Sequence, residues 1–231
     1  MKHLRVAPLS AANPLWSLFG GGRRIAAVAV FGWALMGGEL AHAAVIYNES
    51  VSGDLSNSGL NPTVISVAPG SNQVFGTPGK NPATLIIDRD YFTFTVPDGL
   101  SLSAVTVLPG TKNLGPHGDS FIGLEAGPQV TVLTTATTAA GLLGWDHYDS
   151  GDIGNNILPD MGSAGLGATD FTGPLGAGTY SFWIQEASGC TVPYGFDFTL
   201  TAAPEPDSWP VVLAVVGLLG MSRLHKRHIG R

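Results

Sequence analysis

The central part of this 231-residue chain is predicted to be all-β, an antiparallel two-sheet β-sandwich or jelly roll of about nine strands. The prediction depends on two observations. Apolar and polar residues alternate with period two in several short runs, which is the pattern of half-buried strands. Glycine (32 residues) and proline (16 residues) are frequent between these runs, where they favour turns. A helical signal segment and a short transmembrane helix are expected to flank this domain.

The alternation is clearest in residues 91–96, 180–185 and 196–201, in which every second residue is aromatic or aliphatic. Shorter runs of the same kind predict further strands at residues 64–67, 73–75, 84–87, 102–108, 120–124 and 130–134. A short helix is expected only at residues 137–143.

Residues 1–43 have the parts of a secretory signal peptide. A basic flank that ends in Arg23 and Arg24 precedes an uncharged apolar run, residues 25–35. This run is too short to span a bilayer comfortably. Ala41 and Ala43 form a small-x-small site, so cleavage is expected immediately before Ala44. A twin-arginine route is an alternative that the residues around Arg23 and Arg24 fit poorly.

Residues 204–231 have a different composition from the central domain. Pro204, Glu205 and Pro206 precede an uncharged stretch, residues 209–222, and a basic cluster follows it. At about 1.5 Å per residue, a helix of this stretch is about 21 Å long, against a hydrocarbon core of about 30 Å. It is therefore expected to be a weak membrane anchor with its basic end in the cytoplasm. A buried core helix is the alternative.

These three C-terminal features together resemble the PEP-CTERM sorting signal of Gram-negative bacteria. The resemblance covers about the last 28 residues and implies that an exosortase, a membrane transpeptidase or protease, processes the chain near Pro204, Glu205 and Pro206. It also implies export by a secretion translocase, transient anchoring in the inner membrane, and a producer of extracellular polysaccharide and biofilm matrix. The mature protein would lie at the cell surface or outside the cell.

The domain between these segments, residues 44–203, is strongly acidic. Its three basic residues, Lys80, Arg89 and Lys112, stand against fourteen acidic ones, which gives a net charge of −11, whereas the whole chain has −6. Such a domain repels phosphate backbones, so nucleic-acid binding is not expected, and it attracts cations.

Two runs of the domain are similar to the β-sandwich of bacterial pre-peptidase C-terminal domains. Residues 88–99 read DRDYFTFTVPDG, an aspartate before an aromatic strand and a turn, and residues 176–182 read GAGTYSF. This resemblance implies an accessory module of a secreted protein that binds or stabilises.

Two local features predict binding sites. Asp146, Asp149 and Asp152 lie in a glycine-rich segment, and carboxylate oxygens on such a loop suit calcium, although the spacing is not that of an EF-hand. A solvated acidic loop with Asx-turns is the alternative. Trp145, beside this segment, and Trp183, on the outward face of its strand, are candidates for stacking on sugar rings.

Ser120 is the one candidate nucleophile, because residues 118–121 are similar to the nucleophile block of GDSL-type hydrolases. A catalytic serine needs an activating base, but the only histidines of the domain are His117 and His147, and neither has the expected spacing. The sequence therefore predicts no enzyme and no cofactor apart from the calcium alternative. It favours a structural or adhesive matrix protein, then a carbohydrate-binding module with or without calcium, and last a secreted serine hydrolase.

Overall fold

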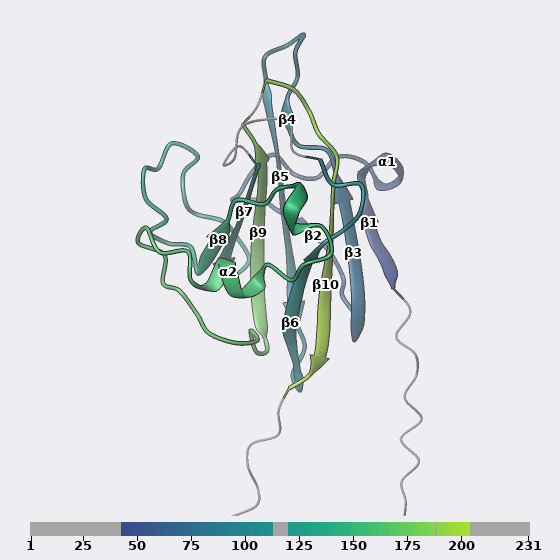
Figure 1. Ribbon diagram of the computed structural model, residues 1–231, viewed down its shortest axis with the longest axis vertical. Coiled ribbons are helices and arrows are strands. Elements are labelled where there is room, and N and C mark those ends of the chain that lie inside the picture. Colours follow the sequence, from purple (N-terminus) through teal and green to yellow (C-terminus); the bar gives the residue numbers. More distant parts are fainter. Residues whose placement is uncertain (1–42, 113–119, 188, 204–231) are drawn as a thin grey trace, which may run out of the picture. The chain divides into compact units, whose positions relative to one another are not determined.

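Two β-sheets make up most of the part of the chain that the structure describes, residues 43–112, 120–187 and 189–203. In this computed structural model all of these residues belong to one unit (Figure 1). Short helical turns lie at α1 (Glu49–Ser52), Ser150–Asp152 and α2 (Leu158–Gly162). The strands are β1 (Ala44–Asn48), β2 (Thr63–Val64), β3 (Gly70–Gly76), β4 (Gly79–Lys80), β5 (Ile87–Val96), β6 (Leu100–Val107), β7 (Ser120–Ala126), β8 (Gly144–Asp146), β9 (Gly178–Glu186) and β10 (Tyr194–Ala202).

The strands form a four-stranded sheet with the order β1-β3-β10-β6 and a six-stranded sheet with the order β2-β5-β9-β7-β8, in which β4 also pairs with β5. The two sheets confirm the predicted two-sheet β-sandwich architecture. The expected antiparallel pairing is found for most neighbours, but β1 with β3 and β2 with β5 are parallel pairs at sheet edges.

The core lies between the two sheets because the apolar positions of each alternating run face inward. Phe92 and Phe94 of β5 stack with Phe182 of β9, with ring centroids 5.2 and 5.1 Å apart. Phe198 of β10, from the other sheet, meets Phe182 edge-on at 4.9 Å. All four side chains are buried. Burial of each contributes roughly 1.5–3 kcal/mol to folding.

The turn predicted after residue 96 carries the chain from one sheet to the other. Leu100 donates its N–H to the carbonyl of Pro97 at 3.1 Å, and Gly99 has a φ of 78°, which a side chain would disfavour. β5 and β6, which this turn joins, therefore belong to different sheets.

Several predicted elements are wrong. Residues 84–86 form a turn and the segment after it, because the Asn81 side chain accepts the N–H groups of Ala83 and Thr84, and Leu85 has a φ of 57°. Residues 130–134 are not a strand and residues 137–143 are not a helix; both belong to an irregular segment. The run 64–67 contributes only Val64 to a strand, whereas β1 and β8 were not predicted.

Strand β3 pairs with both the first and the last strand of the domain. Ala44 of β1 pairs with Asn72, and Leu200 of β10 pairs with Gly70. The start of β1 and the end of β10 therefore lie at the same end of this sheet (Figure 1).

The predicted signal peptide, apart from Ala43, and the predicted sorting signal lie outside the described residues. Ala43 is exposed, and β1 begins at the next residue, Ala44. Within the described part of the chain, none of the helices has the length and apolarity needed to cross a membrane.

Candidate functional site

An aromatic cluster lies on the face of the six-stranded sheet that is turned away from the core. Gly123 of β7 pairs with Trp183 of β9 on one side and with Trp145 of β8 on the other. The Phe121 ring covers Gly123, stacking with Trp145 at a centroid distance of 6.1 Å and meeting Trp183 edge-on at 4.9 Å. A Cβ added at Gly123 would lie 2.9 Å from this ring, so glycine leaves the space that the ring fills.

A cavity of about 210 Å³ opens beside these rings, and we call it the aromatic pocket. Trp145 is half-buried there, and its Nε1–H donates to the carbonyl of Gly165 at 3.3 Å. Trp183 is only 6% exposed, because Tyr91 stacks on it at 5.8 Å and the irregular segment packs against it. Of the two predicted sugar-stacking residues, Trp145 is thus the accessible one. Residues that line the pocket include Phe121, Leu142, Trp145, His147, Leu166 and Trp183.

A second hollow, of about 420 Å³, is also lined by Trp145, and we call it the acidic hollow. The three predicted calcium ligands, Asp146, Asp149 and Asp152, line it together with Asp160. The structure thus brings these three residues together around one space.

Within this hollow each of the three carboxylates also accepts a backbone N–H. Asp146 accepts from His147 at 2.8 Å, Asp149 from Gly151 at 2.6 Å, and Asp152 from Asp149 at 2.8 Å. Of these, only the bond from Gly151 to Asp149 is the Asx-turn contact of the alternative interpretation. Burial, reinforced by the charges of Asp152 and Asp160, raises the pKa of Asp146 to about 6.

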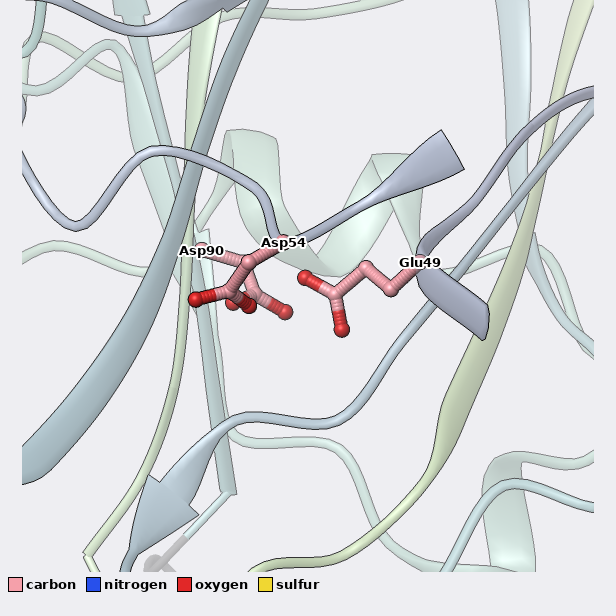
Figure 2. Close-up of side chains that lie close together, drawn as sticks. All are labelled: Glu49, Asp54 and Asp90. Atoms are coloured by element: carbon pink, nitrogen blue, oxygen red, sulfur yellow. The ribbon is translucent and has the colours of Figure 1, made fainter. Parts of the chain in front are cut away.

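A second acidic group was missed by the sequence analysis, and we call it the acid triad. Glu49 at the start of α1, Asp54 shortly after α1 and Asp90 on β5 each have an oxygen within 4.8 Å of the oxygens of the other two. Figure 2 shows the three side chains pointing toward one another. Asp90 has the same parity as Phe92 and Phe94, so its position on the core-facing side of the strand was readable from the alternation. The approach of Glu49 and Asp54 was not, because it is produced by the fold.

Ser120 does not have the surroundings of a nucleophile in the described residues. It is fully buried, and its hydroxyl donates to the Glu186 carboxylate at 2.5 Å. His147 contacts the Ser120 carbonyl oxygen through Nδ1 at 3.0 Å. The other histidine considered, His117, lies outside the described residues.

The predicted processing residues Ala41, Pro204, Glu205 and Pro206 also lie outside the described residues. The chain matches no family model, and no curated protein is similar enough to count as a match.

Proposed function

We propose that this chain is the precursor of an exported, non-enzymatic adhesive protein of the cell surface or extracellular matrix. The support is the order of its segments: a signal-peptide pattern in residues 1–43, a β-rich domain, and the Pro204-Glu205-Pro206 tail in residues 204–231. A translocase would export it, an exosortase would process the tail, and the short apolar helix would anchor the precursor in the inner membrane until then.

We further propose that the domain adheres by binding a sugar ring of extracellular polysaccharide in the aromatic pocket. The observation that carries this proposal is that Trp145 lines both the aromatic pocket and the acidic hollow. An indole provides a flat apolar surface for the C–H face of a sugar, and carboxylates provide acceptors for its hydroxyl groups. Pockets that are mainly apolar with a few polar groups at the rim are typical ligand sites.

Calcium in the acidic hollow is a second way in which this site could hold a sugar. Asp146, Asp149 and Asp152 line the acidic hollow together with Trp145, so a cation held by them would be near the hydroxyl groups of a sugar bound at Trp145. Chelator would then release the glycan from the domain.

The position of Ser120 favours binding over hydrolysis. A nucleophile has to reach its substrate, whereas the Ser120 side chain is buried and its proton is directed to Glu186. This supports the non-enzymatic form of the proposal.

The test is retention of the purified full-length chain on immobilised matrix polysaccharide from the producing bacterium. We expect Trp145→Ala to abolish retention and Trp145→Phe to preserve part of it, because phenylalanine keeps an apolar ring at this position. Val64→Ala, which alters a residue that is 80% exposed on β2, is the control and should bind like the wild type.

Two outcomes would contradict the sugar-binding proposal. One is wild-type protein that passes through the column unretained. The other is a Trp145→Ala variant that has the wild-type melting temperature and is still fully retained.

A further inference from the structure

The acid triad lies where the two sheets meet, at the end of β3 opposite the start of β1 and the end of β10. Asn48, just before Glu49, pairs with Phe75, next to the last residue of β3. Gly76, that last residue, pairs with Tyr194 at the start of β10. Asp90 approaches from β5 of the other sheet. The triad therefore joins the α1 segment, which follows β1 of the four-stranded sheet, to β5 of the six-stranded sheet.

Asp90 is fully buried, yet neither of its carboxylate oxygens makes a hydrogen bond of normal geometry. The hydroxyl of Tyr194, which is 2% exposed, interacts with this carboxylate, but not with the geometry of a normal hydrogen bond. A Cβ added at Gly76 would be 2.5 Å from the Tyr194 hydroxyl oxygen and 2.6 Å from Asp90 Oδ2, so both groups face the space that glycine leaves. Buried polar groups are normally paired, and these point to a ligand that satisfies them.

The Glu49 carboxylate is held in position by the backbone. Its Oε1 accepts the N–H of Leu55 at 3.0 Å, and its Oε2 accepts the N–H of Thr77 at 2.7 Å. These bonds leave lone pairs on both oxygens. The segment that carries Asp54 is fixed as well, because Gly53 donates its N–H to the Glu49 carbonyl at 3.1 Å.

The charges that act on Asp90 come from Glu49, Asp88 and Asp54 and are all negative. Carboxylates brought this close in a buried place require either protons or a cation.

We propose that Glu49, Asp54 and Asp90 bind one calcium ion, with the Tyr194 hydroxyl beside it. Two oxygens bound to one Ca²⁺ at about 2.3–2.6 Å lie at most about 5 Å apart, which agrees with the 4.8 Å limit of the triad. The donor groups are all oxygens, which suit calcium rather than zinc or copper. Magnesium demands a stricter octahedral shell and keeps several waters, so it fits a group of three carboxylates less well.

Calcium here would fasten the start of the domain to its core. Glu49 begins the short α1 segment next to β1, an edge strand, and Asp54 follows α1, while Asp90 belongs to β5 within the other sheet. The site is separate from the acidic hollow, which contains none of the three residues. It does not depend on sugar binding.

The test is calorimetric titration of the chelator-treated full-length chain with CaCl2 and, separately, with MgCl2. We expect Ca²⁺ to bind, to raise the melting temperature, and to bind more tightly than Mg²⁺. Asp54→Asn keeps the shape of an exposed side chain. It should abolish the binding of one Ca²⁺ per chain or weaken that binding at least about tenfold. Asp90→Asn should do the same while raising the melting temperature in chelator, because it removes the buried acid.

Two further variants serve as controls. Asp98→Asn changes an exposed acid far along the chain and should leave Ca²⁺ binding unchanged. Asp146→Asn changes the acidic hollow and should not remove the triad's ion. The proposal is overturned if the wild type binds no Ca²⁺, or if all binding is lost in Asp146→Asn and retained in Asp54→Asn.

Discussion

Ser120 and Glu186 stand opposite each other on strands β7 and β9, and the serine hydroxyl donates a hydrogen bond of 2.5 Å to the carboxylate inside the domain. Both residues are fully buried. The pair links two neighbouring strands of the six-stranded sheet, so its role is structural.

Ser120→Ala is therefore expected to lower the free energy of unfolding without changing any hydrolytic activity. Loss of a hydrogen bond to a buried carboxylate costs about 1.5–3 kcal/mol. Ser181→Ala is the matched control, because Ser181 is also buried but donates to a neutral carbonyl, that of Gly127, and should cost about 1 kcal/mol. Urea unfolding measures both. An esterase activity that disappears in Ser120→Ala alone would reverse this interpretation.

The stability of the calcium-free protein is expected to fall as pH rises. Burial and the charges of Glu49, Asp88 and Asp54 raise the pKa of Asp90 from 3.8 to about 9, against the smaller opposing effect of the Tyr194 hydroxyl. The folded state thus holds a proton that the unfolded state releases above about pH 4. The contribution of this Asp90 proton to the free energy of unfolding is fully present below that pH and is lost progressively as the pH rises to about 9.

The measurement is the free energy of unfolding in EDTA at several pH values for the wild type and Asp90→Asn. Their difference isolates Asp90 from the other carboxylates, and we expect the wild type to lose stability more steeply. Saturating Ca²⁺ should reduce this slope, because the cation replaces the proton. Parallel curves for the two proteins in EDTA would contradict the burial of an uncompensated acid.

Gly76→Ala tests the close approach of the two sheets. The added methyl group would lie 2.5 Å from the Tyr194 hydroxyl oxygen, so we expect a loss of about 1–3 kcal/mol in stability and weaker Ca²⁺ binding. Gly176→Ala is the matched control, since a Cβ there meets nothing within 4 Å. Thermal unfolding and calcium titration should separate the two variants, and equal behaviour would argue against the tight packing at Gly76.

The sorting proposal predicts a shortened protein in the native host. The intact mass of the mature chain should correspond to a start at Ala44 and an end near Pro204-Glu205-Pro206, without the apolar stretch and basic tail. Deletion of the exosortase should restore the mass of the tail. A full tail in the presence of active exosortase would exclude this processing.

The strands with strict alternation were predictable because a single energetic demand, burial of every second side chain, determines them. Residues 91–96, 180–185 and 196–201 all lie within strands of the structure. The strand predictions for 84–87 and 130–134 failed, the first because of local hydrogen bonds and the second because of tertiary packing. The Asn81 side chain accepts backbone N–H groups that a strand would use, and Val130 is buried in the cluster that contains Trp183.

The aromatic pocket was half predictable. Trp145 and Trp183 were named from their positions, but the burial of Trp183 is caused by Tyr91 and by a distant segment that packs on it. The acid triad could not be predicted without the fold, because Glu49 and Asp90 approach each other only once β1 and β5 have joined different sheets. Of the three residues, only Asp90 could be recognised in the sequence, because it is a charged residue at a position that faces the core.

The position of β3 between β1 and β10 determines which end of the domain an anchor would hold. Because the domain begins and ends at the same end of this strand, an anchor on either terminus holds the same end toward the membrane. Gly76 and the acid triad are then at the far end, where Asp54 is exposed and Glu49 is half-buried. A precursor still attached to the cell would thus already sample external calcium, before any processing releases it.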